Sequence, residues 1–174
     1  MNMRAIEKLS ILDFEASSLS ENSWPIEVGI SRVEGDLVQT WSTLIQPDQE
    51  WDLSDWSSQS ARVHQISMSS LQNAPAASRV AKDILTKSSD CVLVSDAPVF
   101  ERRWLSRLLE TAGFSSIPEI ADFDAVSFAL FDGLALDLLY EKLERTRVPH
   151  RAGPDSARLA SGWLRAKNVN ARSR

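Results

Sequence analysis

The sequence contains only one cysteine, Cys91, among its 174 residues. A lone cysteine cannot form an intrachain disulfide, so the disulfide-stapled class of small secreted domains is excluded. No apolar run approaches the roughly 20 residues that a transmembrane helix needs, and the first residues lack the apolar stretch of a secretory signal. These absences predict a cytoplasmic protein that has no membrane partner. The apolar run at residues 91–94 predicts a buried strand that contains Cys91.

Positive charge is not in excess either. The chain has 19 Lys and Arg residues against 24 Asp and Glu residues, which gives a net charge of −5 and a pI of about 5.1. This balance argues against a protein that holds nucleic acid through a broad basic surface. It leaves open a metal-dependent enzyme that acts on a nucleic-acid end, because bound cations neutralise the local field.

The remaining composition is that of a globular domain, with 43% hydrophobic and 25% charged residues. We predict one domain over residues 1–174, with a frayed tail at about 168–174. Alternating or continuous apolar segments predict strands at residues 9–14, 25–33, 37–45, 91–94 and 119–121. Helical patterns are found at residues 57–63, 69–73, 76–87, 100–112, 124–131, 134–145 and 156–166. Asp124 is expected to cap its helix and Gly113 to end the one before it. The order of elements predicts an α/β fold in which helices flank a mixed sheet.

Two carboxylates, Asp13 and Glu15, stand at the end of the first predicted strand with Phe14 between them. Residues i and i+2 of a strand point to the same face, so these two carboxylates would lie side by side while Phe14 enters the opposite layer. Like charges this close repel each other unless a divalent cation lies between them, and hard cations such as Mg²⁺ prefer carboxylate oxygens. The pair therefore indicates a candidate metal site.

A second group of polar residues lies near the end of the chain, in His150-Arg151-Ala152-Gly153-Pro154-Asp155. Gly-Pro interrupts regular backbone, which predicts a loop at His150 and places Asp155 at the start of the last helix, where Asp is also a good N-cap. A histidine has an unperturbed pKa of roughly 6.5 and can accept a proton from water at neutral pH. The pattern suits a general base beside a metal-binding carboxylate.

These segments resemble the motifs of the DEDDh branch (DnaQ-like) of the 3′–5′ exonucleases. Residues 13–19, Asp-Phe-Glu-Ala-Ser-Ser-Leu, resemble the first motif, in which small residues and then a Leu follow Asp-x-Glu. Residues 95–105 resemble the second motif, with Phe100-Glu101 and Trp104-Leu105 at the family's offsets. Residues 150–157 resemble the third, with Asp five positions after His and Ala two further on. The motifs occur in the family's order, from residue 11 to about residue 165.

The resemblance implies a ribonuclease H-like fold, whose five-stranded mixed sheet combines an antiparallel meander with parallel strands and is flanked by helices. It implies hydrolysis of phosphodiester bonds at the 3′ end of single-stranded DNA or RNA, with release of nucleoside monophosphates. Two divalent ions, Mg²⁺ or Mn²⁺, would be held by four carboxylates, those of Asp13, Glu15, Glu101 and Asp155. His150 would activate the water, Leu19 would pack on the terminal base, and the backbone of Ala16 would approach the 3′-hydroxyl.

The chain departs from the family at Glu101, where the family has Asp. The extra methylene moves the carboxylate by about 1.5 Å at most, so the ligand could adapt, the site could favour Mn²⁺, or Asp96 could substitute for it. The alternative function is a catalytically weakened nucleic-acid-binding or regulatory module of the same fold. A homodimer or a polymerase-type partner is also open.

Several other polar and aromatic residues match family positions or could contact substrate. We interpret His64 as structural and Trp51 and Trp56 as covering a loop. Glu27 suits packing as well as function, and the guanidinium groups of Arg102 and Arg103 could meet phosphate or solvent.

Overall fold

The computed structural model describes residues 3–172, and the side chains of residues 5–169. Its centre is a five-stranded sheet in the order β3-β2-β1-β4-β5. The antiparallel meander consists of β1 (Leu9–Ala16), β2 (Pro25–Glu34) and β3 (Leu37–Leu44). β4 (Val92–Ser95) and β5 (Ile120–Asp122) continue the sheet in parallel with β1. The predicted five-stranded mixed sheet, an antiparallel meander continued by parallel strands, is confirmed.

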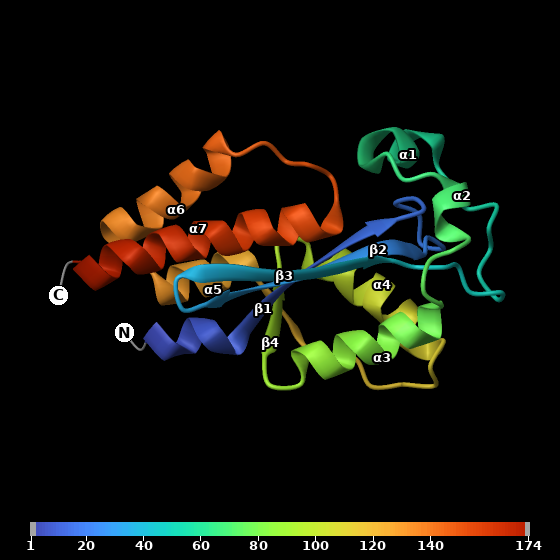
Figure 1. Ribbon diagram of the computed structural model, residues 1–174, viewed down its shortest axis with the longest axis horizontal. Helices are drawn as coiled ribbons and strands as arrows, with labels where there is room; N and C mark the ends of the chain where they lie inside the picture. Colours follow the sequence, from blue (N-terminus) through green and yellow to red (C-terminus); the bar gives the residue numbers. More distant parts are fainter. Residues whose placement is uncertain (1–2, 173–174) are drawn as a thin grey trace.

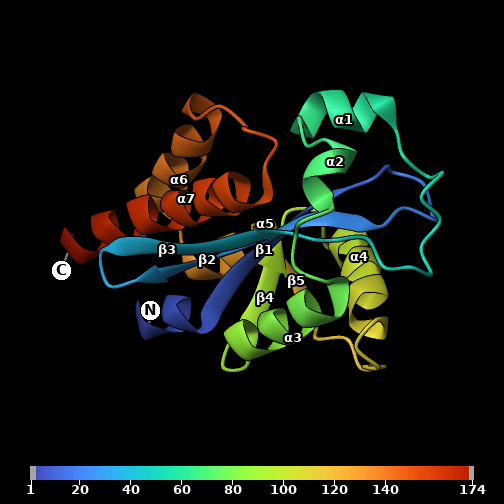
Figure 2. The same cartoon turned by 45° about the vertical axis from the view of Figure 1, so that its right-hand side comes forward.

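Helices cover both faces of this sheet (Figures 1 and 2). α3 (Ala77–Ser88) and α4 (Pro98–Glu110) lie on one face, and α5 (Phe123–Leu130), α6 (Gly133–Arg145) and α7 (Ala152–Arg172) lie on the other. The short helices α1 (Ser58–His64) and α2 (Met68–Leu71) stand beyond the ends of β1 and β2. A 3-10 helix, η1 (Met3–Lys8), precedes β1.

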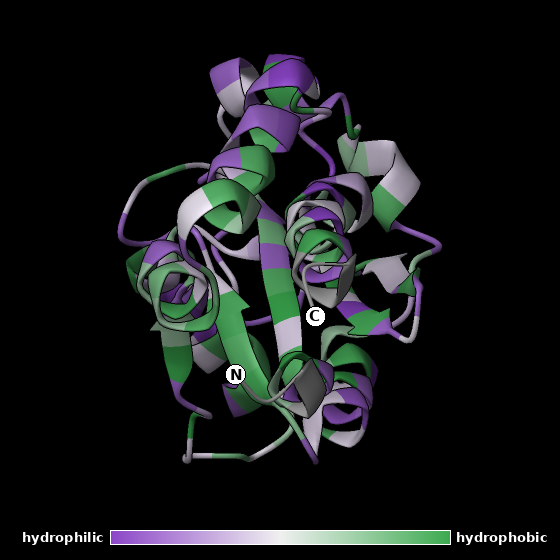
Figure 3. Cartoon of the chain, turned by 90° about the vertical axis from the view of Figure 1, so that its left-hand side faces the viewer, coloured by the Kyte–Doolittle hydropathy of each residue, from purple (hydrophilic) through white to green (hydrophobic). Residues whose placement is uncertain are grey.

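Alternation along β1 separates two apolar cores. Leu12 and Phe14 face α3 and α4, whereas Ile11 faces the α5–α7 layer. Asp13 and Glu15 share the parity of Ile11, so they point toward the layer that contains α7. Figure 3 shows the hydrophobic residues gathered on the strands and on the inward faces of the helices.

The start of α7 lies directly against β2. A Cβ on Gly29 would come within 2.1 Å of the carbonyl oxygen of Ala152, so only glycine lets the two backbones approach this closely. Two residues further along the same face, the hydroxyls of Ser31 and Ser156 are hydrogen-bonded at 2.9 Å. The close contact fixes the N-terminal end of α7 over β1 and β2.

The predicted start of the last helix was wrong. α7 begins at Ala152 and not at Ser156, because Gly153 and Pro154 fall in its first turn. The first N–H groups of a helix have no intrahelical acceptor, so a proline there costs no hydrogen bond. The helix also continues to Arg172, so the described part of the predicted tail is helical.

Two other local predictions need correction. Asp122, rather than Asp124, caps α5, and its side chain accepts a hydrogen bond from the N–H of Ala125 at 2.8 Å. Cys91 is half-buried in the turn just before β4 rather than inside the strand. The other predicted helices and strands differ from the structure by no more than two residues at either end. Gly113, with φ of 79°, forms the predicted turn after α4.

Among the described residues, no helix is both long enough and apolar enough to cross a membrane.

Candidate active site

Three carboxylates meet at the C-terminal end of β1. Asp13 and Glu15 come from β1 and Asp155 from the first turn of α7, and one oxygen of each lies within 4.8 Å of the others. The parity of β1 and the close contact between β2 and α7 bring together residues that are far apart in the sequence. A register shift between Glu15 and Ala16 marks a β-bulge at the same point, a feature frequent beside active sites.

Burial, and after it the crowding of negative charge, governs the protonation of this cluster. Burial, followed by repulsion from Asp155 and Glu27, raises the pKa of Glu15 from its ordinary value of 4.5 to about 8. Burial and the charge of Glu15 likewise raise the pKa of Asp13 well above its usual range. Burial also raises the pKa of Asp155, although Arg158 and His150 act in the opposite direction. The cluster therefore resists full ionisation in the absence of a cation.

Glu101 approaches Asp13 from the other side of the sheet. It lies in the first turn of α4 and is 2% exposed, and its Oε2 has no hydrogen-bond partner. Burial, and then the charge of Asp13, raises its pKa well above the usual range, while the backbone N–H of Phe14 acts in the opposite direction. Glu101 is outside the three-carboxylate cluster, but one of its oxygens is free to bind a further ligand.

Asp96, the alternative to Glu101, occupies a different environment. It is exposed just after β4, although its charge still contributes to the raised pKa of Asp13 and of Glu101. The structure thus places both candidates near Asp13, with Glu101 as the buried one.

An ion pair that sequence analysis did not identify connects β2 to the third motif. The guanidinium of Arg151 donates two hydrogen bonds to Glu27, from Nε to Oε2 at 2.9 Å and from Nη2 to Oε1 at 2.6 Å. Oε2 of the buried Glu27 also accepts the N–H of Ala152 at 3.0 Å. The backbone N–H of Arg151 in turn donates to Oδ2 of Asp155 at 2.9 Å. The predicted N-cap role of Asp155 is thus wrong, because its carboxylate reaches back from inside the first turn.

His150 lies on the predicted loop, immediately before α7. Its φ of 56° falls in the left-handed region, which is uncommon for a residue other than glycine. The side chain is exposed and lies within electrostatic reach of Asp155. A solvent-accessible imidazole is therefore held beside the carboxylate cluster.

A pocket of about 430 Å³ opens next to the carboxylates, between β1, α1 and α4. Its polar wall includes Asp13, Glu15 and Glu101, and its lining also contains Ala16 at the end of β1. Three exposed apolar side chains, those of Leu19, Val63 and Phe100, also line it. Leu19 is 71% exposed, and Arg103 donates a hydrogen bond to its carbonyl oxygen at 3.4 Å. The pocket joins an acidic end to an apolar rim.

His64, interpreted as structural from the sequence, also lines the pocket. Its Nδ1 accepts the N–H of Ile66 at 3.0 Å, so the proton of the neutral ring is on Nε2. That Nε2 is buried without a partner. Residue spacing in the sequence could not reveal this donor, because the tautomer of His64 depends on which ring nitrogen accepts the hydrogen bond from Ile66.

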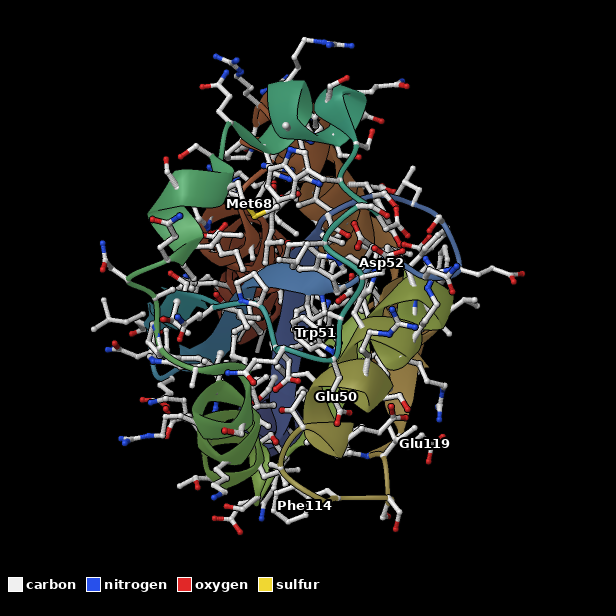
Figure 4. All side chains as sticks on the ribbon, turned by 90° about the vertical axis from the view of Figure 1, so that its right-hand side faces the viewer. Glu50, Trp51, Asp52, Met68, Phe114 and Glu119 are labelled. Atoms are coloured by element: carbon white, nitrogen blue, oxygen red, sulfur yellow. The ribbon has the colours of Figure 1, made fainter. Side chains whose placement is uncertain are left out.

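The tryptophans of the preceding loop pack together as predicted. Trp51 stacks on the buried Trp24 with ring centroids 5.9 Å apart, and Trp56 lies 5.8 Å from the same ring. The edge of Trp56 meets His64 at 5.9 Å. Figure 4 shows Trp51 on this loop, between the labelled Glu50 and Asp52. The aromatic cluster supports the wall of the pocket that carries His64.

Comparison with solved structures shows which fold this arrangement shares. The chain is similar to Exonuclease X in complex with 5′ overhanging duplex DNA, with 18% identity and a TM-score of 0.60 over 94% of this chain and 93% of that one. It is similar to the nuclease domain of 3′hExo, a DEDDh family member, bound to rAMP, with 15% identity and a TM-score of 0.66 over 94% and 93%. A full-length 3′-exonuclease has 16% identity and a TM-score of 0.65 over 95% and 83%.

Neither the protein-family models nor the curated protein sequences gave a match. At 15–18% identity, structural similarity establishes the fold. The chain therefore has the fold of the DEDDh-type 3′-exonucleases.

The donor set fits divalent cations. Carboxylates are the ligands that Mg²⁺ and Mn²⁺ prefer, and the cluster offers them from two elements of the fold. Oε2 of the buried Glu101 has no hydrogen-bond partner, as is expected of an oxygen that awaits a ligand. Oδ1 of Asp155 also lacks a hydrogen bond, but Nε of Arg158 lies 4.0 Å from it. Positive charge there would also remove the repulsion that raises the pKa values of Asp13 and Glu15.

Proposed function

We propose that the protein is a metal-dependent 3′–5′ exonuclease that removes nucleoside monophosphates from the 3′ end of single-stranded DNA or RNA. The observation that carries the proposal is the convergence of Asp13, Glu15 and Asp155 within 4.8 Å beside an open pocket. The shared fold of the solved 3′-exonucleases supports the same conclusion.

Four carboxylates would hold the ions, those of Asp13, Glu15, Asp155 and Glu101. Two divalent ions, when bound, stabilise charge on the attacking and leaving oxygens of phosphodiester hydrolysis. Glu101 is preferred to Asp96 as the fourth ligand because it is buried, borders the pocket and has an unpartnered oxygen. The ion pair between Arg151 and Glu27 holds Asp155 in place for this task.

His150 would act as the general base. Water attacks the phosphorus between the last two nucleotides, the imidazole of His150 takes its proton, and the bond from phosphorus to the 3′ oxygen breaks. The leaving oxygen is then protonated by solvent, and the terminal nucleotide departs as its 5′-monophosphate. Exposure of His150 beside Asp155 suits this role, since the imidazole can return the proton to bulk water.

The pocket would receive the terminal nucleotide. Leu19 and Phe100 offer apolar faces on which any base can stack, which requires no particular sequence. The backbone of Ala16, which also lines the pocket, would approach the 3′-hydroxyl. The Nε2–H of His64 is a free donor for a polar group of the same nucleotide.

The experiment that tests this proposal is digestion of 5′-labelled single-stranded DNA and RNA oligonucleotides with Mg²⁺, Mn²⁺ or EDTA. We expect a ladder that shortens from the 3′ end and is abolished by EDTA. Asp13→Asn should lower the rate by a factor on the order of 10³, because charge stabilisation by a bound ion contributes several kcal/mol. Equal rates for the parent and Asp13→Asn proteins would contradict the proposal.

A second candidate is a binding or regulatory module of the same fold with weakened chemistry. It is favoured by one observation, that Glu101 is outside the group of carboxylates within 4.8 Å of one another. This candidate predicts oligonucleotide binding with no ladder under either ion.

A further inference from the structure

Charge is unevenly distributed along the chain. Residues 142–174 contain nine of the 19 Lys and Arg residues but only two of the 24 Asp and Glu residues. The C-terminal part of an acidic protein is therefore strongly basic. A charge asymmetry of this kind indicates contact with a polyanion.

The fold brings together the segments that carry the described cations. These segments are the last turn of α6, the loop of residues 146–151 and α7, which lie above the sheet (Figure 1). Lys142, Arg145 and Arg165 line a hollow of about 220 Å³ between α6 and α7. Glu141 supplies the carboxylate of this hollow. Arg147 extends the basic surface into the loop that ends at His150 and Arg151.

Some of these cations are already committed to internal contacts. Arg151 binds Glu27, Arg158 donates to the carbonyl oxygen of Leu143, and Lys167 donates to that of Gly35. Arg145 pairs with Glu141 at 2.6 Å, yet its side chain remains 76% exposed.

Three further cations among the described side chains remain available. The side chains of Lys142, Arg147 and Arg165 are exposed and have no hydrogen bond or ion pair within residues 3–172. Four cations, those of Lys142, Arg145, Arg147 and Arg165, can therefore contact an external anion, and we call them the α6–α7 basic surface.

We propose that the α6–α7 basic surface binds the phosphates of the nucleic-acid strand behind its 3′-terminal nucleotide. The inference rests on the proposed function, because it takes the strand's end to be at the carboxylate cluster. The loop of six residues, 146–151, connects the basic surface directly to His150 and to the start of α7. The phosphates of a strand that leaves the pocket across this loop move away from the carboxylates, which repel them, and toward the four cations, which attract them. Phosphate contacts of this kind position a strand without reading its sequence.

The test separates binding from cleavage. The Arg145→Glu/Arg165→Glu variant and its parent are titrated in EDTA with a labelled single-stranded oligonucleotide of roughly 16 nucleotides, using fluorescence anisotropy. We expect the variant to bind about tenfold more weakly, with a salt dependence of log K reduced by about 0.7 for each lost phosphate contact. With Mg²⁺ present, KM for the same oligonucleotide should rise while the rate on a dinucleotide, which is too short to reach α6, stays within about twofold.

The matched control is Arg79→Glu/Lys82→Glu on α3. Arg79 forms an exposed i,i+4 pair with Asp83, as Arg145 does with Glu141, but α3 covers the opposite face of the sheet. Thermal unfolding of both variants is measured to check that they fold. Equal oligonucleotide affinity of the parent and the α6–α7 variant would overturn the inference. Binding of both proteins to anionic lipid vesicles is measured as well. A variant that binds vesicles more weakly than the parent but binds the oligonucleotide equally well would also overturn it. If the variant binds the oligonucleotide more weakly and the parent cleaves no oligonucleotide, the phosphate-binding role of the α6–α7 basic surface is supported and the proposed function is rejected.

Discussion

Arg151 and Glu27 form a two-hydrogen-bond ion pair that joins the start of α7 to the middle of the sheet, at 2.9 Å and 2.6 Å. Glu27 is the cross-strand neighbour of Glu15, and the N–H of Arg151 donates to Asp155. One ion pair thus sets the position of a carboxylate from β1 relative to a carboxylate from α7.

Replacing Glu27 with Gln removes the charge that Arg151 needs. We expect a rise of about tenfold in the Mg²⁺ concentration that supports half-maximal cleavage, because a shift of about 1 Å in Asp155 weakens a shared site. Unfolding free energy should fall by about 1–3 kcal/mol, because a neutral amide replaces the charged acceptor of the half-exposed Arg151. Calorimetric Mn²⁺ binding separates the two effects. Glu34→Gln, at the exposed end of β2, is the control and should change neither quantity. A lower Tm with unchanged Mn²⁺ affinity would mean that the pair is only structural.

The stability of the metal-free protein should decrease as pH rises. The raised pKa of Glu15, from 4.5 to about 8, means that the folded chain binds more protons than the unfolded chain between those values. The contribution of the protonated carboxyl is present below pH 4.5 and is lost as pH rises through about 8. The stability lost over this pH range is on the order of a few kcal/mol. Each kcal/mol corresponds to a decrease of roughly 2–4 °C in Tm. Differential scanning calorimetry in EDTA measures it.

Divalent ions should reverse this trend. Carboxylates must lose their protons to bind a cation, so Mn²⁺ should raise Tm more at pH 8 than at pH 5. Asp13→Asn serves as the comparison, and its Tm in EDTA should depend less on pH because one of the repelling charges is gone. A parent Tm that is constant or rises between these pH values would contradict the electrostatic account.

Shortening Glu101 should lower the proposed cleavage activity. Glu101→Asp withdraws the carboxylate by about 1.5 Å, and we expect cleavage to fall by a factor of roughly 10 to 100. The control is Glu110→Asp, at the exposed end of the same helix, which should leave the rate unchanged. A large gain in activity from Glu101→Asp would instead favour the weakened-module candidate, with Glu101 as the cause of the weakness.

Removing the free donor of His64 should weaken substrate binding. His64→Phe keeps the ring but loses Nε2–H, and we expect KM to rise by roughly fivefold to thirtyfold, the equivalent of about 1–2 kcal/mol. His64→Gln retains an N–H donor and should restore part of the loss. KM and Tm are measured on the same samples. Loss of the hydrogen bond from Ile66 should lower Tm in both variants, whereas loss of the Nε2–H donor should raise KM in His64→Phe more than in His64→Gln. An unchanged KM in His64→Phe would leave His64 with a packing role alone.

Local patterns predicted the sheet and the carboxylate pair of β1, whereas the set of four carboxylates followed from the resemblance to the DEDDh family. Alternation in β1 correctly placed Asp13 and Glu15 on the face opposite Phe14, because strand geometry allows little else. The start of α7 was missed because Gly-Pro breaks a helix interior but not a first turn. The pairing of Glu27 with Arg151 and the orphan Nε2 of His64 depend on tertiary contacts between distant segments, for which the sequence has no local signal.

The carboxylate cluster draws Asp13 from the first strand and Asp155 from the last helix. These residues meet only after the segment from β1 to the start of α7 has been synthesised and α7 has packed against β2. Such long-range contacts are costly in loop-closure entropy, so they are expected to form late in folding. A ribosome-bound chain that lacks α7 contains Asp13 and Glu15 but not Asp155, the third member of the cluster. Acquisition of divalent-ion binding during refolding would therefore report the final docking step.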